Sequence, residues 1–293
     1  MELLQLYYFQ TVARREHISR AAEELRVAQP SLSRTIARLE AELGVPLFDR
    51  HGRRIRLNHF GALFLARVDR ALGELDDARR ELADAAGLDL GTVSIAAENL
   101  QALSDLLAAF LRDHPGVNVR LSQSSAPVML RQLAAGEVDL CLASQPLPGS
   151  YLRSVEIRRE EVLLAVPPHH PLAGRSEVGV PALADEPFVT TRPGYWQRSL
   201  LDRLFADAGL EPAIACEGDE PAAIRSLISA GLGIGLLPAA AYEAAAGPSV
   251  AWLRIDAPDC HRVLRLVHRD DGYLSAAARS LRDVATEHFR TAG

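Results

Sequence analysis

The sequence predicts an α/β protein built from three parts: a small helical head, one long helix and a two-lobed α/β region. Three observations carry this prediction. Residues 1–58 show helical apolar spacing interrupted by turn residues, residues 59–87 carry a heptad repeat, and residues 91–293 alternate short apolar strands with amphipathic helices.

Composition places the chain among ordinary globular proteins. It has 293 residues, of which 24% are charged and 48% hydrophobic. Because no run of 18 apolar residues occurs, and the N-terminus lacks a secretory pattern, we expect a cytoplasmic protein with no membrane partner. Cys141, Cys216 and Cys260 are too few and too widely spaced for a disulfide framework or structural zinc, so we expect no metal and no cofactor.

Charge is divided unevenly along the chain. The net charge is −6, and all 32 basic residues are arginine. Residues 1–58 nevertheless hold ten arginines against seven acidic residues. A basic head on an acidic body predicts that the head alone meets a polyanion such as nucleic acid.

The head is predicted to contain three helices. Apolar residues from Leu3 to Ala13 define the first, and Ser19 is a candidate N-cap for a second over 20–25. After a turn at 26–28, a third helix is predicted over 29–43, with Pro30 in its first turn and Gly44 ending it. Two helices joined by so tight a turn form a helix-turn-helix.

A β-hairpin is predicted next, over residues 47–57. Gly52 marks its turn, and Ile55 and Leu57 alternate with Arg54 and Arg56. Such a wing carries guanidinium groups at its tip, where they can contact phosphates.

The residues of the head also resemble a known family. The run from 17 to 50, HISRAAEELRVAQPSLSRTIARLEAELGVPLFDR, is similar in register to the LysR-type transcriptional regulators, and the resemblance extends more loosely over the whole chain. It implies a sequence-specific DNA-binding regulator, switched by a small-molecule effector or co-inducer, that recruits RNA polymerase. No nucleophile–base–acid constellation stands out, so we expect no enzymatic activity.

DNA contacts are expected from the start of the third helix, which enters the major groove in such motifs. Base edges are assigned to Gln29, Pro30, Ser33 and Arg34, and phosphates to Ser31, Thr35, Arg53 and Arg54. As an alternative, Ser31 and Ser33 satisfy backbone groups of the first turn.

Two neighbouring features, one ion pair and one N-cap position, qualify this assignment of DNA contacts. Arg38 and Glu42 are interpreted as a solvated i,i+4 pair rather than DNA contacts. Ala28 stands where the family often has Ser or Thr, and losing that cap oxygen costs about 1 kcal/mol of helix stability.

The helix over 59–87, with Asn58 as N-cap, carries the heptad. Its apolar positions are Leu65, Val68, Leu72, Leu75 and Leu82. This spacing predicts a two-stranded coiled coil and hence a homodimer, or a tetramer, that reads an inverted-repeat operator in double-stranded DNA. The alternative is an amphipathic helix packed against its own domain.

The region over 91–293 is expected to fold as two open α/β lobes. Lobe I comprises about 91–160 and 267–293, and lobe II about 161–266. Expected strands lie at 92–96, 117–121, 138–143, 162–166, 188–191, 213–217, 234–237 and 264–268. This arrangement resembles the periplasmic-binding-protein-like effector domain of the family.

Effectors in such sheets lie at the carboxyl ends of the strands, near helix N-termini. The candidates there are Asn99, Ser124, Ser125, Gln145, Thr190, Thr191 and Arg192. They suit a small anion such as a carboxylate, although serines at these positions are also common helix caps. Glu98 either weakens this interpretation or indicates a zwitterion whose amine meets it.

Three patterns are interpreted as structural, and one of them is Cys141, which lies in an apolar strand and is expected to be a small core residue. Residues 231–235, GLGIG, follow a helix and precede a strand, which is the wrong order for a dinucleotide fingerprint. His169 and His170 lie between prolines and are expected in a surface turn.

The alternative function is a two-lobed small-molecule-binding protein or transferase without a DNA-binding role, which would not need residues 1–58.

Overall fold

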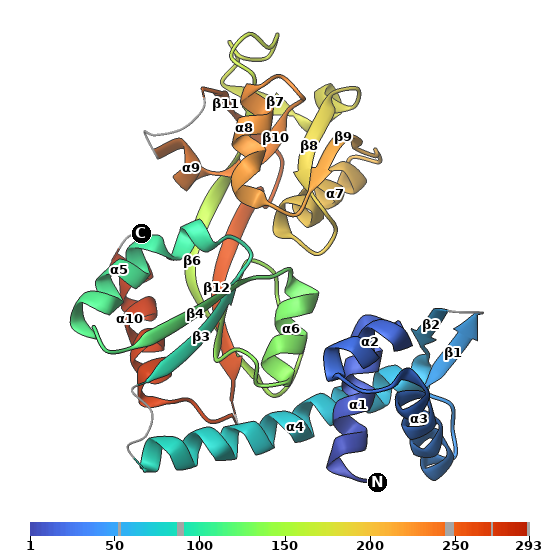
Figure 1. Ribbon diagram of the computed structural model, residues 1–293. Coiled ribbons are helices and arrows are strands. Elements are labelled where there is room, and N and C mark those ends of the chain that lie inside the picture. The colour runs from blue at the N-terminus through green and yellow to red at the C-terminus, as the bar shows by residue number, and fades with distance from the viewer. Residues whose placement is uncertain (52–53, 87–90, 244–248, 271, 292–293) are drawn as a thin grey trace. The chain divides into compact units, whose positions relative to one another are not determined.

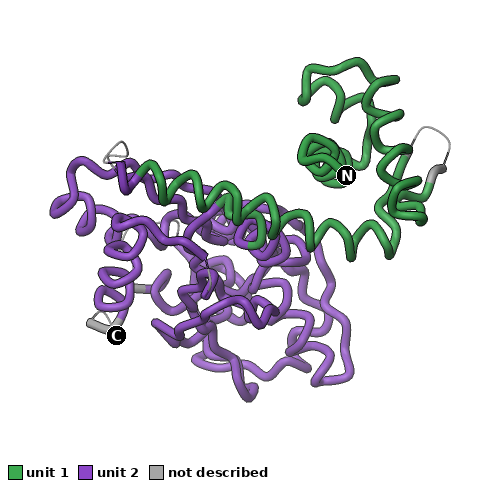
Figure 2. The backbone as a smooth tube through the Cα atoms, turned by 90° about the horizontal axis from the view of Figure 1, so that it is seen from below, with its two compact units in different colours: residues 1–83, 134–137 green, residues 84–133, 138–293 purple. Residues whose placement is uncertain are grey.

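The computed structural model describes residues 1–51, 54–86, 91–243, 249–270 and 272–291. The chain divides into two compact units, residues 1–83 with 134–137 and residues 84–133 with 138–293 (Figure 2). No helix within the described ranges is long and apolar enough to cross a membrane.

The first unit begins with three helices, α1 (Leu3–Arg15), α2 (Ile18–Leu25) and α3 (Gln29–Leu43), as Figure 1 shows. Their apolar faces meet in one core, where Phe9, Val12, Leu32, Ile36 and Leu39 are almost fully buried. The 3.6-residue spacing of these side chains explains why each helix forms and which face it buries. The third helix has the bounds that the sequence predicts.

The helix ends are set by local chemistry. Gly44 ends α3 at a φ of 73°, a left-handed conformation that glycine adopts without strain. The predicted N-cap of α2 is wrong: the helix begins at Ile18, and the Nδ1 atom of His17 accepts from Arg20 N at 3.4 Å. A histidine ring nitrogen therefore does the capping that the sequence analysis assigned to Ser19.

The wing forms from β1 (Phe48–His51) and β2 (Arg54–Leu57), paired antiparallel with Phe48 opposite Leu57. Two carboxylates join it to the helices. Glu40 of α3 accepts from the backbone N–H groups of Leu47 and Phe48, at 2.8 and 3.3 Å, and Glu16 accepts from Leu57 N at 3.0 Å. The orientation of the hairpin against α3 therefore depends on one half-buried acceptor, Glu40, and one exposed acceptor, Glu16.

The long helix α4 runs over His59–Ala85, and Asn58 caps it by accepting from Gly61 N at 2.8 Å. The predicted heptad seam is wrong in its first half. Val68 and Leu72 are each 2% exposed and Leu65 packs beside them, all in the core of α1–α3. Leu75 and Leu82 are 44% and 70% exposed. The first half of α4 thus follows the alternative of a helix packed against its own domain.

The second unit is organised by one eight-stranded sheet, in the order β4-β3-β5-β12-β6-β11-β7 with β10 also paired to β6, beside a pair β8-β9. The strands are β3 (Thr92–Ala97), β4 (Asn118–Gln123), β5 (Leu140–Ala143), β6 (Leu152–Val166), β7 (Glu177–Gly179), β8 (Pro187–Thr191), β9 (Ala213–Gly218), β10 (Gly235–Pro238), β11 (Ala251–Asp256) and β12 (His261–Arg269). Strands β3, β4 and β5 are parallel, as the alternation of strands and helices predicts.

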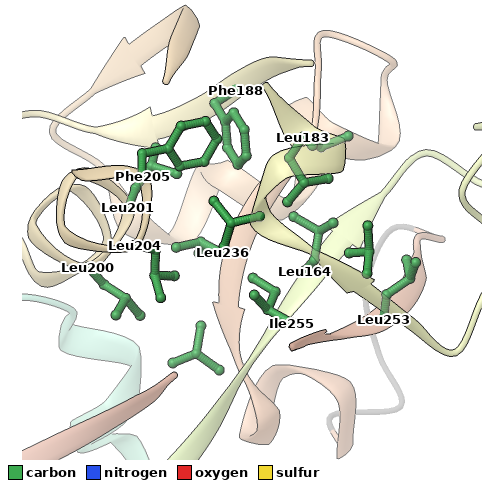
Figure 3. Close-up of a cluster of buried hydrophobic side chains, with 14 of the residues drawn as sticks. Leu164, Leu183, Phe188, Leu200, Leu201, Leu204, Phe205, Leu236, Leu253 and Ile255 are labelled. Carbon is green, nitrogen blue, oxygen red and sulfur yellow. The ribbon is translucent and has the colours of Figure 1, made fainter. Parts of the chain in front are cut away.

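Helices cover this sheet. They are α5 (Ser104–Asp113), α6 (Ala126–Ala134), α7 (Trp196–Asp207), α8 (Ile224–Ser229), α9 (Ala239–Glu243) and α10 (Ala276–Thr291), with short 3-10 turns at Leu100–Leu103, Val180–Leu183 and Pro221–Ala223. We use lobe I for β3–β5 with α5, α6 and α10, and lobe II for β7–β11 with α7–α9. Figure 3 shows the lobe II core, where Phe188 and Phe205 pack edge to face beside Leu201 and Leu236.

Two long antiparallel strands, β6 and β12, run through both lobes (Figure 1). The sequence predicted only the last third of β6, as a strand over 162–166, and the strand over 264–268 within β12. The charged run Arg158-Arg159-Glu160-Glu161 in the middle of β6 hid the continuity of that strand. These residues stay in the ladder because β12 pairs with them, with Arg262 opposite Glu160.

Candidate DNA interface and effector cleft

The start of α3 presents polar side chains on its solvent face. Gln29, Pro30, Ser31 and Arg34 are exposed, and Ser33 and Thr35 are half-buried. On the opposite face, Leu32 and Ile36 are 0% and 1% exposed. Because the buried face fixes the rotation of the helix, the six predicted side chains of α3 lie together around its first two turns.

Hydrogen bonds within α3 determine which of these side chains still have N–H or O–H donors for DNA. Thr35 Oγ1 donates to Ser31 O at 3.1 Å, so the single proton of its hydroxyl is already used. Arg34 Nε donates to Pro30 O at 3.3 Å, which leaves the four N–H groups of its two terminal nitrogens for an external acceptor. Arg34 is therefore better suited than Thr35 to contact DNA.

Other predicted residues of the head have clear placements. Arg38 Nε lies 3.1 Å from Glu42 Oε1, as the predicted i,i+4 pair requires. Ala28 occupies the N-cap of α3, where its methyl group offers no acceptor. Arg53 lies outside the described residues, and Arg54 is placed only as a backbone position in β2. The role of Glu16 and Glu40 as acceptors for the wing was not predicted, because a carboxylate that bonds to a distant strand leaves no local sequence pattern.

Lobe I and lobe II meet through hydrogen bonds around Gln145. Its Nε2 donates to Gly194 O at 3.1 Å, and its Oε1 accepts from Ser199 Oγ at 3.0 Å. Ala126 N also donates to Gly194 O at 3.0 Å, and Gln123 Nε2 donates to Asp219 O at 3.0 Å. The carboxyl ends of β4, β5, β8 and β9 are thereby brought to the junction of the two lobes, which we call the cleft.

Three buried charged residues lie at this junction, and they are called the cleft floor. Glu98, Glu160 and Arg262 are 2%, 9% and 7% exposed. Arg262 lies 3.4 Å from Glu160, donates to Ser144 Oγ at 2.9 Å and stacks 5.1 Å from the ring centre of Trp196. Arg262, a cation of the strand β12 that runs through both lobes, is therefore held by groups from both lobes.

Burial shifts the protonation of this group. Loss of hydration raises the pKa of the Glu98 carboxyl above its ordinary value, although hydrogen bonds from Ser144 and the charge of Arg262 oppose the shift. Burial likewise lowers the pKa of the Arg262 guanidinium, against the attraction of Glu160 and Glu98. The sequence analysis singled out Glu98 but missed Glu160 and Arg262, which β6–β12 pairing alone brings together.

The predicted lobe I residues are partly engaged in local structure. Asn99 Oδ1 accepts from Gln101 N at 2.9 Å and so caps the turn that follows β3. Ser124 is 4% exposed, and its N–H donates to Ala97 O. Ser125 lies against Gly194, whose backbone has a φ of 96° and where an added Cβ would meet the Ser125 Cβ at 3.4 Å. Of these residues, Ser125 and Gln145 lie nearest lobe II.

The predicted effector residues of lobe II do not all lie on the same side of strand β8. Successive strand residues face opposite sides. Thr190 shares the side of Phe188 that faces α7, and Thr191 shares the side of Val189 that faces α8. Arg192 is exposed and lies 3.5 Å from Asp219, so its charge is already paired. The buried cation of the cleft is Arg262 rather than Arg192.

Six buried side-chain atoms find no hydrogen-bond partner within the part of the chain that the structure describes, and three of them belong to residues near the junction of the lobes. These three are Thr191 Oγ1, Gln197 Oε1 and Glu160 Oε2, the last of which lies 4.0 Å from Arg158 Nε. Buried polar atoms are usually paired, so such atoms in a cleft are candidates for ligand contacts. Gln197 adjoins Trp196 in α7, and no sequence pattern marked it.

The residues that the sequence analysis set aside have structural placements. Cys141 is fully buried in β5, and burial raises the pKa of its thiol above the ordinary value of 9.0. His170 Nε2 lies 3.2 Å from Glu186, and its Nδ1 accepts from Leu172 N at 3.3 Å. These contacts fit a packed core residue and a stabilised surface turn.

Comparison with known families agrees with this division of the chain. Residues 3–62 match the model of the bacterial regulatory helix-turn-helix protein, lysR family. Residues 86–290 match the model of the LysR substrate binding domain. The chain belongs to the LysR family of transcriptional regulators.

Curated relatives cover this LysR-family regulator from end to end. It is 35% identical to the uncharacterized HTH-type transcriptional regulator YybE of Bacillus subtilis, with 99% of each chain covered. It is 32% identical to the transcriptional dual regulator GltC of the same organism, over 99% of this chain and 98% of the relative. Both relatives are named as transcriptional regulators.

Solved structures show the same fold. The LysR-family regulator CbnR matches with a TM-score of 0.61 and 26% identity, over 98% of this chain and 99% of that one. CbnR complexed with its target DNA matches with a TM-score of 0.54 and 27% identity, over 97% and 100%. This LysR-family chain is therefore a regulator with a helix-turn-helix DNA-binding domain and an effector-binding domain, in a family whose members bind DNA as oligomers.

Proposed function

We propose that two copies of α3 read an inverted-repeat operator and that a small molecule bound between lobes I and II changes the affinity for that operator. The observation that carries the DNA half is the first two turns of α3. There, polar side chains are exposed over a face opposite to buried Leu32 and Ile36. A helix held by its apolar face, with its N-terminal half exposed, is the geometry that enters a major groove.

Individual roles follow from the chemistry of each side chain. Gln29 matches the donor and acceptor edge of adenine, Arg34 matches guanine, and Pro30 supplies an apolar contact for a thymine methyl. Ser33 has a hydroxyl that can bond either type of base edge. Ser31 and the wing arginines contact phosphates, and the engaged hydroxyl of Thr35 contributes least.

The subunits associate through a face of α4 that differs from the one that the heptad predicted. At 100° per residue, Phe60, Leu63, Leu75 and Leu82 fall within one arc of about 120°. These side chains are 49%, 58%, 44% and 70% exposed. Exposed apolar side chains in one stripe are typical of a surface that a partner covers, and a second copy of the same helix supplies the complementary stripe.

The effector binds where the two lobes meet. Ser125 and Gln145 of lobe I and Thr191 and Gln197 of lobe II contribute polar contacts, with Arg262 beneath them. Arg262 suits an anionic group, and the acceptors Gln197 Oε1 and Glu160 Oε2 suit a donor such as an amine. A small zwitterion or a carboxylate with a donor group matches both. The regulator acts on DNA in the cytoplasm, where it recruits RNA polymerase.

A titration of the full-length protein against duplex DNA tests this proposal. A duplex selected from a random library is compared with a scrambled duplex at 50 and 200 mM salt, by fluorescence anisotropy. We expect the selected sequence to contain an inverted repeat and the binding to weaken steeply with salt. Binding that ignores both the sequence and the salt concentration would contradict the proposal.

A further inference from the structure

A cavity of about 570 Å³ opens in lobe I. Its walls come from the first residues of β6, the last residues of β12, the segment after β12, and α10. The side chains that matter below are Arg153, Arg269, Arg279, Arg282, Val155 and Leu266. All of them belong to the second unit.

The cavity is separate from the cleft between the lobes. In the β6–β12 ladder, Arg153 pairs with His268, whereas Glu160 of the cleft floor pairs with Arg262. Those two positions of β12 are six residues apart, which is about 20 Å at 3.3 Å per strand residue. A molecule in the cavity therefore touches none of the charged groups that form the cleft floor.

Positive charge dominates the described lining. Four guanidinium groups from three segments face one carboxylate, that of Asp270, which lies 3.5 Å from Arg153. Arg282 lies 2.8 Å from Asp283, its neighbour in α10, and Arg279 donates to Leu274 O at 2.5 Å. Each of these contacts uses a fraction of the five N–H donors of a guanidinium, so donors remain for an anion.

The side chain of Arg269 is packed into the wall of the cavity. It is 7% exposed, and an added Cβ at Gly272 would meet its guanidinium at 2.7 to 2.8 Å. The glycine therefore leaves the space that the guanidinium occupies. His268, 6% exposed, lies beside it, with its Nδ1 atom 2.7 Å from Arg269 O. A buried cation held in this way is a feature of a formed site rather than of a solvated surface.

Apolar groups complete the cavity. Leu266 is 2% exposed, and Val155 is 39% exposed although it lies on a strand of the central sheet. Leu274 and the ring of Tyr273 also contribute to the lining. A fully hydrated inorganic anion would gain nothing from these groups, whereas an organic anion with a hydrocarbon body would bury them.

We propose that this cavity is a second ligand site, which binds a small organic carboxylate with an apolar body. The carboxylate accepts charge-assisted hydrogen bonds from Arg279 and Arg282, and the hydrocarbon part covers Val155 and Leu266. The site is independent of the proposed effector cleft and of the DNA interface. Its failure would therefore leave the proposed function standing.

Three probes with the same six-carbon chain separate the contributions of charge and apolar contact. Hexanoate, hexan-1-ol and hexylamine are titrated into the full-length protein by isothermal titration calorimetry. We expect hexanoate to bind, hexan-1-ol to bind at least ten-fold more weakly and hexylamine not to bind, because the guanidinium groups attract the anion and repel the cation. Equal binding of hexylamine and hexanoate, or no binding of hexanoate at 10 mM (a generous limit of about −2.7 kcal/mol for so small a ligand), would overturn the proposal.

Matched variants place the bound hexanoate. The double variant Arg279→Gln with Arg282→Gln should weaken its binding roughly ten-fold or more. The control variant Arg112→Gln with Arg120→Gln removes the same charge from exposed positions elsewhere in lobe I and should leave binding unchanged. An equal loss in both double variants would show a general charge effect and overturn the site.

Two single variants cover the remaining outcomes. Val155→Glu introduces a carboxylate on the apolar wall and should abolish hexanoate binding, which also serves as the test if the double variant does not fold. Thr191→Val changes a cleft residue at constant shape and should leave hexanoate binding intact. If Thr191→Val abolishes binding and the cavity variants do not, hexanoate occupies the cleft and the proposed second site is wrong.

Discussion

Substitution of Leu82 by glutamine tests which face of α4 joins the subunits. Leu82 is 70% exposed in the single chain. Full burial of a leucine side chain contributes about 1.5–3 kcal/mol, so covering this exposed part contributes about 1–2 kcal/mol. Because a two-fold interface contains the residue twice, Leu82→Gln should weaken the dimer by about 2–4 kcal/mol, or roughly 30-fold to 700-fold in Kd.

Sedimentation velocity over a concentration series measures this change directly. The matched control is Glu81→Gln, which places the same side chain one residue away and about 100° around the helix. We expect the control to associate like the unsubstituted protein. Leu72→Ala provides the contrast: because Leu72 is buried in the core of the same chain, its loss should cost about 2–5 kcal/mol of folding stability instead.

The outcome that would refute this reasoning is equally specific. If Leu82→Gln and Glu81→Gln associate with the same Kd, the exposed stripe is not the seam. If Leu72→Ala dissociates a protein that remains fully folded, the heptad predicted from the sequence describes the interface better than the exposed stripe does.

Three further predictions concern stability. Glu40→Ala leaves the N–H groups of Leu47 and Phe48 without their carboxylate acceptor and should cost about 2–3 kcal/mol in urea unfolding, whereas Glu40→Gln keeps an acceptor and should cost less; equal costs would remove the carboxylate from this role. Gly61→Ala places a Cβ 2.1 Å from Leu47 O and should destabilise the head by about 1–3 kcal/mol, although alanine favours a helix; a gain in the free energy of unfolding would contradict the close approach. Because burial raises the pKa of Glu98 in the folded protein, the folded state binds more protons than the unfolded state above pH 4.5, and stability falls as pH rises through the folded pKa. Glu98→Gln removes that titration. The free energy of unfolding of this variant minus that of the unsubstituted protein should therefore rise with pH above 4.5. A difference that stays constant from pH 5 to 8 would contradict the buried carboxyl.

The head was predictable because its determinants are local. The spacing of Leu32, Ile36 and Leu39, a proline in the first turn and a glycine at the end specify α3 to the residue. The cap of α2 was not predictable in the same way, because His17 and Ser19 both carry side chains that accept a hydrogen bond, and only the position of Ile18 decides between them.

The interpretation of α4 failed where two apolar stripes share one helix. A heptad count selects residues at 3.5-residue spacing, but it does not say whether the surface they meet belongs to the same chain. Leu65, Val68 and Leu72 meet the core of α1–α3, and this preference depends on residues more than 30 positions away, such as Phe9. Leu75 and Leu82 lie beyond the reach of that core and stay exposed.

The two-lobed architecture was predicted, but the contacts between the lobes were not. Strand ends can be read from a sequence, so the positions of Ser125 and Gln145 near the lobe junction followed from it, whereas their role in effector binding stays a prediction. The charged floor depends on the antiparallel register of β6 and β12, which no local pattern in either strand reveals. The exposed Arg192 was assigned from its place after an expected strand, whereas Arg262 was not assigned, because it lies outside the strand expected over 264–268.

The most direct test of DNA reading compares Arg34→Ala with Arg38→Ala on the selected and the scrambled duplex. Both residues lie on α3, but Arg34 keeps donors for DNA and Arg38 is paired with Glu42. We predict that Arg34→Ala loses about 1–3 kcal/mol on the selected duplex and little on the scrambled one, while Arg38→Ala changes neither by a comparable amount. An equal loss on both duplexes for Arg34→Ala would contradict base reading by α3.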